Sequence, residues 1–116
     1  MRRTLDQKTI NSLKEKVRDL VIWLNQEGFH TIDSGDGSDY LRGMEGAIEE
    51  PMVAISVEPH LLISKSNRLV MLLQEMGISI SPIGTEFSPT IEASYDPTNG
   101  LAVIILTNVL SKDIKN

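Results

Sequence analysis

The sequence predicts an α+β protein, a small and mainly antiparallel sheet with two helices packed on one face. Three observations predict it: an apolar stripe at helical spacing opens the chain, a second stripe follows the strand-like segment Met52–Val57, and an alternating segment, a turn and an apolar run come last. At 116 residues the length corresponds to a single α+β domain, residues 1–116.

The first predicted element is one long helix over residues 5–27. Thr4–Gln7 has the form of a capping box, and Gly28 occupies the position of a left-handed C-terminal cap. Ile22 and Trp23 lie beside the stripe and indicate a second buried contact, such as one with a partner subunit. The apolar residues that recur on one face of this helix are Ile10, Leu13, Val17, Leu20, Val21 and Leu24.

A buried strand and a second helix are predicted in the middle of the chain. Met52–Val57 is short, nearly all apolar and rich in β-branched residues, which is typical of a buried strand. The stripe over residues 61–76 predicts a helix that ends before Gly77. Its start stays open, because Pro59 could occupy the first turn or Ser64 could cap a shorter helix.

The last third of the chain predicts an irregular connection over residues 78–89 and then a β-hairpin. Thr90–Tyr95 alternates polar and apolar residues, Asp96–Gly100 is a strong turn signal, and Leu101–Leu106 is continuously apolar. A strand that is apolar on both faces belongs at the centre of the sheet, with the first strand on its far side. Its uncovered apolar side favours a homo-oligomer.

Composition and charge exclude several classes of function. The chain has no cysteine, which excludes disulfides, thiolate metal sites and cysteine nucleophiles. The net charge is -5, and six of the eleven basic residues fall in the first eighteen positions, so a broad nucleic-acid-binding surface is not expected. No segment has membrane-spanning length and no signal peptide follows Met1–Arg3, which favours a cytoplasmic protein without a membrane partner.

The segment Thr31–Gly46, TIDSGDGSDYLRGMEG, is predicted to be a long acidic, glycine-rich loop. Asp33, Asp36 and Asp39 are spaced three apart, which does not match the alternating ligands of a calcium-binding EF-hand. One interpretation is structural: the carboxylates accept backbone N–H bonds and the glycines supply positive φ. A cation site is the alternative that the carboxylates leave open, although no metal ligand is assigned.

A nucleotide site is the functional interpretation of the same loop. Glycine amides can form a nest for an anion, Arg42 can pair with a phosphate, and an aspartate can hold a ribose hydroxyl. The loop lacks the GxGxxG dinucleotide fingerprint. The predicted ligand-binding residues are Thr31, Asp33, Ser34, Gly35, Asp36, Gly37, Arg42, Glu45 and Tyr95.

An enzyme is not expected, and no catalytic residue or cofactor is assigned. His30 and His60 lie near opposite ends of the acidic region, and Ser34 stands in DSGDG rather than in a GxSxG nucleophile elbow. Too few titratable groups are available for a base and the group that would orient it.

Three stretches carry a resemblance to a known group of proteins. GFHTIDSGDGSDYLRGMEGAI, PMVAISV and EASYDPTNG resemble small, mostly uncharacterised phage-encoded proteins with a GF-x-T-x-DSGDG stretch, a Pro-led strand and a Y-x-P-x-x-G hairpin. The resemblance covers residues 28–106 and implies no settled activity. By analogy of class and size, it points to an oligomeric sponge that sequesters nucleotide signals of bacterial immunity in the host cytoplasm.

The leading hypothesis is therefore a phage-type counter-defence protein that binds a small nucleotide. Two alternatives stay open at this point. The acidic loop could engage a basic protein of the host, or its carboxylates could serve a metal-dependent hydrolase.

Overall fold

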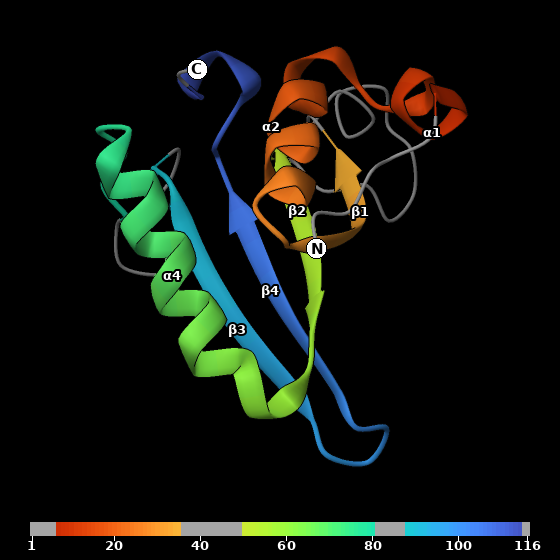
Figure 1. Ribbon diagram of the computed structural model, residues 1–116, viewed down its shortest axis with the longest axis vertical. Coiled ribbons are helices and arrows are strands. Elements are labelled where there is room, and N and C mark those ends of the chain that lie inside the picture. The colour runs from red at the N-terminus through yellow and green to blue at the C-terminus, as the bar shows by residue number, and fades with distance from the viewer. Residues whose placement is uncertain (1–6, 36–49, 81–87, 115–116) are drawn as a thin grey trace.

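The computed structural model describes residues 7–35, 50–80 and 88–114. Four strands form one sheet in the order β1-β2-β4-β3, and every neighbouring pair is antiparallel. Helices α2 and α4 lie on the same face of the sheet (Figure 1), so the predicted α+β fold is confirmed. The elements are α1 (Gln7–Ser12), α2 (Glu15–Gln26), β1 (His30–Gly35), β2 (Met52–Val57), the short 3-10 helix η1 (Pro59–Leu61), α4 (Leu62–Glu75), β3 (Thr90–Asp96), β4 (Leu101–Thr107) and the 3-10 helix η2 (Ser111–Asp113).

The central position predicted for the last strand is confirmed. In β4, Ile104 lies opposite Ile55 of β2 and opposite Ala93 of β3. Because β2 and β3 are both antiparallel to β4, they run in the same direction, and α4 is the crossover between them.

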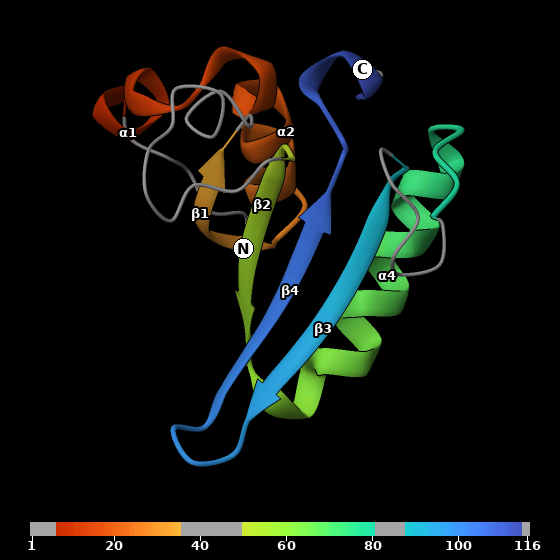
Figure 2. The ribbon, with the colours of Figure 1, turned by 180° about the vertical axis from the view of Figure 1, so that it is seen from behind.

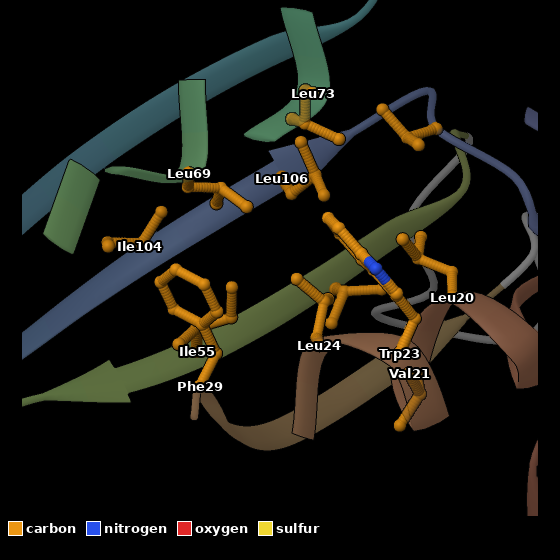
Figure 3. Close-up of a cluster of buried hydrophobic side chains, with 12 residues drawn as sticks. Leu20, Val21, Trp23, Leu24, Phe29, Ile55, Leu69, Leu73, Ile104 and Leu106 are labelled. Atoms are coloured by element: carbon orange, nitrogen blue, oxygen red, sulfur yellow. The ribbon is translucent and has the colours of Figure 1, made fainter. Parts of the chain in front are cut away.

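The core lies between the two helices and one face of β2 and β4. Alternate residues of these strands point toward the helices, as the two-residue period of a strand requires. Figure 3 shows the resulting cluster, to which both helices and both strands contribute. Its buried members are Leu20, Val21, Trp23, Leu24, Phe29, Val53, Ile55, Leu69, Leu73, Ile104, Leu106 and Val109. Figure 2 shows the opposite face of β3 and β4, across which no described helix lies.

The first predicted helix is interrupted, which corrects the expectation of one helix over residues 5–27. Lys14 has φ -65° and ψ 136°, an extended conformation that separates α1 from α2. The Nη2 group of Arg18 donates to the Leu13 carbonyl at 2.9 Å, and so provides a partner for a carbonyl at the break. The apolar stripe continues in phase across the interruption, so hydrophobic periodicity does not reveal it. The predicted start at Leu5 lies outside the described residues.

The end of α2 follows the prediction, but the expected role of Trp23 does not. Gly28 has φ +92°, and the Phe29 N–H donates to the Leu24 carbonyl at 2.9 Å, as in a left-handed helix cap. Trp23 is only 8% exposed and points from α2 toward β4 and Leu106 (Figure 3). Its partner is therefore the core of its own chain rather than a second subunit.

Strand β1 corrects the prediction that the whole of Thr31–Gly46 is a loop. Residues 30–35 pair with β2, with a register shift between Thr31 and Asp33 that leaves Ile32 as a bulge. The segment carries neither an apolar alternation nor an apolar run, and edge pairing with β2 overrides its polar, glycine-containing composition. The rest of the predicted loop, residues 36–49, lies outside the described residues.

The remaining predicted elements are confirmed where the structure describes them. β2 has the predicted bounds, and Pro59 begins a 3-10 turn that continues directly into α4. Residues 78–80 have no regular structure, and residues 81–87 lie outside the described part. β3 and β4 form the predicted hairpin, whose turn ends at Gly100 with φ +66°.

Candidate functional site

Thr31, the first of the predicted ligand residues, is used by the fold. Its Oγ1 atom accepts a hydrogen bond of 2.8 Å from the Nδ2 group of Asn25 in α2. Asn25 is 1% exposed and also donates to the Val21 carbonyl at 2.8 Å. Thr31 therefore supplies a partner to a buried amide, and it joins β1 to α2.

The other described residues of the predicted loop site lie along β1 toward its end. The Asp33 carboxylate accepts the Ser34 N–H at 2.9 Å, which is a bond within the strand itself. Asp33 is exposed, and Gly35 closes the strand opposite Met52. Four further predicted residues lie outside the described part of the chain, namely Asp36, Gly37, Arg42 and Glu45.

Tyr95 lies at the opposite end of the sheet from Gly35. Tyr95 is opposite Ala102, which in turn is opposite Val57 at the end of β2, whereas Gly35 is opposite Met52 at its beginning. Five residues of β2 separate these two levels, or about 17 Å at the usual rise of a strand. The structure thus brings Thr31, Asp33, Ser34 and Gly35 together on β1 and leaves Tyr95 apart.

A cleft of about 490 Å³ opens at the end of the sheet where β1 begins and β2 ends. Three parts of the chain form it: the α2–β1 turn, the segment from β2 to the first turn of α4, and the β3–β4 hairpin. The residues that line it are Gly28–His30, Ser56–Pro59, Leu61, Lys65 and Gly100–Leu101.

Lys65 is the basic residue that α4 contributes to this cleft. Its Nζ atom lies 5.5 Å from the centroid of the Phe29 ring, and the side chain is half-buried. Among the residues that the structure describes, the Lys65 ammonium has no hydrogen-bond or ion-pair partner. An ammonium that lines a cleft and has no carboxylate partner is available to an anion that enters the cleft.

Arg68 lies one turn further along α4 and, unlike Lys65, has acceptors within the described structure. Its guanidinium also covers Phe29, at 5.3 Å from the ring centroid. However, Nη1 donates to the Glu27 carbonyl at 2.6 Å, and Nη2 lies 3.3 Å from the Glu27 carboxylate. Of the two cations over Phe29, only Arg68 is paired within the described structure.

The rest of the lining is mainly apolar, with His30 and Ser56 as polar residues and one carboxylate at the rim. Val57 and Leu61 are half-buried, and Leu101 is 57% exposed. The Glu58 side chain is 70% exposed and lies 3.4 Å from Nε2 of His60. The cleft is therefore suited to a ligand that has both an anionic group and an apolar or planar part.

Sequence reasoning did not predict this cleft, although it used several of its residues. Gly28 was predicted only as a helix cap, and Lys65 lies within a segment predicted only to be helical. No local pattern joins Phe29 to Lys65, because the turn before β1 and the helix after β2 meet only through the sheet. The available signal was that α4 has two basic residues one turn apart, Lys65 and Arg68.

Among residues 7–35, 50–80 and 88–114, no group of three or more metal-ligating side chains is placed to hold an ion. Within the same ranges, no helix has the length and apolar character needed to cross a membrane. Comparison of the chain with protein-family models, curated proteins and solved structures finds no match.

Proposed function

We propose that this protein is a binding protein that captures a small anionic ligand of the nucleotide class in the cleft beside Lys65. The observation that carries the proposal is the Lys65 ammonium, which belongs to a half-buried side chain in the cleft and has no acceptor among the described residues. A phosphate oxygen would supply a charge-assisted hydrogen bond to this group. Arg68 would not compete for the ligand, because Glu27 already neutralises it.

The dimensions and walls of the cleft favour a ligand larger than a free phosphate. A volume of about 490 Å³ lies within the range of small-molecule sites. Val57, Leu61 and Leu101 offer an apolar wall against which a nucleobase could pack. Leu101 would gain most from this contact, because it is 57% exposed without a ligand.

In this proposal the protein acts by holding its ligand, which lowers the concentration of the free ligand. Sequestration is also the role suggested by analogy of class and size with small phage-encoded proteins, with a nucleotide signal of bacterial immunity as the captured molecule. The binding residues differ from those expected on sequence grounds: Lys65 takes the role proposed for Arg42, and the cleft lies at the far end of β1 from Gly35.

The test is a thermal-shift and calorimetric screen of linear and cyclic mono- and dinucleotides, with inorganic phosphate as the reference anion. A ligand present at 100 times its Kd is expected to raise the stability by about 2.7 kcal/mol. Lys65→Met should weaken the binding by about 1.5–3 kcal/mol, the usual worth of a charged hydrogen bond. The matched control is Lys16→Met, which removes the same charge from an exposed site on α2.

The proposal is contradicted if Lys65→Met and Lys16→Met bind the nucleotide equally well, or if no nucleotide in the screen binds. The same screen is run with Mg²⁺ and Ca²⁺ alone. Stabilisation by a cation without a nucleotide would favour the metal-site hypothesis. Stabilisation by neither would favour a basic protein partner for the acidic segment.

A further inference from the structure

Strand β3 is an edge strand of the described sheet, and it lacks the bulge, the lysine and the proline that often block the pairing of an edge. All seven of its residues pair with β4 without a bulge, and no described strand pairs with its outer edge. The segment Glu92–Tyr95 is exposed on both faces of the strand. The strand contains no lysine and no proline, and these are common protections of an edge. Within the described residues, its outward backbone N–H and C=O groups have no strand partner, so they can pair with another strand.

The neighbouring helix also has an unusual surface on this side. Lys65 and Arg68 of α4 point to Phe29 and Glu27, which fixes the flank that faces α2. At 3.6 residues per turn, the flank that faces away from α2 carries a stripe without any charge. Its residues are Ile63, Ser66, Val70 and Gln74. Ile63 is 77% exposed, and Met71 beside the stripe is 61% exposed.

We propose that β3 pairs antiparallel with β3 of a second copy, about a two-fold axis through Ala93, so that two sheets become one continuous sheet. An axis perpendicular to the sheet keeps the helices of both copies on the same face. It also turns the uncharged flanks of the two α4 helices toward each other. Depletion of charge is the compositional mark of the core of an interface.

The register follows from the symmetry and from the charges of β3. Residues that lie opposite each other in an antiparallel pair share a face, so a two-fold axis perpendicular to the sheet must place one residue opposite itself. With Ala93 at the axis, Glu92 lies opposite Ser94, and no two carboxylates are directly opposed. With Glu92 at the axis the two Glu92 side chains oppose each other, and with Ser94 there Glu92 opposes Asp96. Like charges directly opposite are destabilising.

The remaining registers are shorter. Placing Ile91 or Tyr95 at the axis brings Pro89 or Pro97 into the pairing, and proline has no N–H to donate. The register about Ala93 uses the whole strand from Thr90 to Asp96.

This register also accounts for the exposure of Tyr95. Tyr95 and Ile91 lie opposite Ala102 and Leu106, so they share the helix-covered face of the sheet. Tyr95 is 52% exposed in the single chain. In the proposed dimer it lies opposite Ile91 of the second copy and packs against it. Pairing at β3 does not depend on the ligand proposed for the Lys65 cleft.

The absence of cysteine from the chain permits a direct test with single-cysteine variants. In Ala93→Cys the two new side chains lie directly opposite each other, with Cβ atoms about 4.5–5.5 Å apart, from which a disulfide can form. In the matched control Tyr95→Cys, the two cysteines are four residues apart along the strand, or about 14 Å. Mild oxidation at micromolar concentration should cross-link Ala93→Cys into a dimer and leave Tyr95→Cys uncross-linked.

Two lysine variants with the same change of charge test the register through the dimer dissociation constant. Ala93→Lys places two ammonium groups opposite each other and should raise the Kd by about tenfold or more. Ser94→Lys places each lysine opposite Glu92 of the other copy and should lower the Kd a few-fold. Both positions are exposed in the single chain, and thermal melts confirm that each variant folds.

Light scattering gives the decisive measurement on the unaltered protein. A dimer is expected at micromolar concentrations. A strict monomer, equal cross-linking of the two cysteine variants, or equal shifts of the Kd in the two lysine variants would each overturn the proposal.

Discussion

The molecule has two halves, α2 with β1 and α4 with β3, and the two helices differ greatly in how much of their surface they bury. Helix α2 has 12 residues and buries six of them, whereas α4 has 14 residues and buries only two. The buried residues of α2 are Val17, Leu20, Val21, Trp23, Leu24 and Asn25, and those of α4 are Leu69 and Leu73. The α2–β1 half also has the buried Asn25–Thr31 hydrogen bond, while the α4–β3 half has exposed apolar residues at Ile63, Met71 and Tyr95.

The difference indicates that the two halves of this domain have different roles, one in folding stability and the other in binding and association. Apolar area removed from water stabilises the single chain, and most of that area in the helices belongs to α2. The shallow α4–β3 half keeps apolar surface exposed, and this half carries Lys65, which lines the proposed ligand cleft, and the proposed dimer edge. Substitutions on the α2 side should therefore change folding stability, and those on the outer side of α4 should change association.

The largest effect expected from this comparison is that of Trp23→Ala. The side chain is 8% exposed and packs into the core, so its removal should cost about 3–5 kcal/mol of unfolding free energy. Met71→Ala on α4 removes a side chain that is 61% exposed, and it should change the stability of the monomer by about 0.5 kcal/mol or less. Denaturant titration of both variants, at a concentration below that of dimer formation, measures the two costs. Similar costs would contradict the proposed division.

Elements whose signals are local could be predicted from the sequence. The hairpin follows from the chemistry of Asp96–Gly100, and the end of α2 follows from Gly28. Strand β1 could not be predicted in this way, because its regular structure comes from pairing with β2, which is distant in the chain. The interruption of the helix at Lys14 was not predicted, because the apolar stripe stays in phase on both sides of it.

The candidate site was harder to predict than the fold. Sequence reasoning placed it where polar residues are dense, yet Thr31 in that stretch is a partner of buried Asn25. The proposed cleft is assembled from three segments that meet only after the sheet forms, and its cationic residue is a lysine on an ordinary amphipathic helix. A high density of polar residues in a sequence does not show which of them make hydrogen bonds within the folded chain and which stay available to a ligand.

Substitutions of Gly100 and Gly35 compare the β3–β4 turn with the end of β1. The expected change in unfolding free energy is smaller than that of Trp23→Ala. Gly100 ends the β3–β4 turn with φ +66°, where a β-branched side chain is strained, so Gly100→Val should cost about 1–2 kcal/mol. Gly35 ends β1 without a positive φ, and a Cβ there meets no described atom within 4 Å, so Gly35→Val should cost much less. Urea titration of the two variants measures this difference. An unchanged midpoint for Gly100→Val would contradict the strain assigned to the turn.

The smallest expected effect concerns the pH dependence of the same turn. The side-chain amide of Asn99, at 2.7 Å from Oδ2 of Asp96, is the largest cause that lowers the pKa of the Asp96 carboxyl. Desolvation opposes this shift, and the backbone N–H groups of Asn99 and Thr98 add to it. Because the pKa is lower in the folded protein than in the unfolded chain, the charged carboxylate favours folding. That contribution is complete above the ordinary pKa of an aspartate and is lost as the pH falls through the lower value of the folded state.

Asp96→Asn removes this titration while it keeps the shape of the side chain. The unaltered protein should be more stable than Asp96→Asn near neutral pH, by an amount that stays constant down to the ordinary range of an aspartate pKa. Below that range the difference should shrink, because the carboxyl group becomes protonated in both states. Thermal melts of both proteins in steps from neutral to acid pH, at one fixed protein concentration, give the two curves. Parallel curves through the acid range would show that the Asp96 carboxylate has the same pKa in both states, and would contradict a contribution of its charge to the stability of the turn.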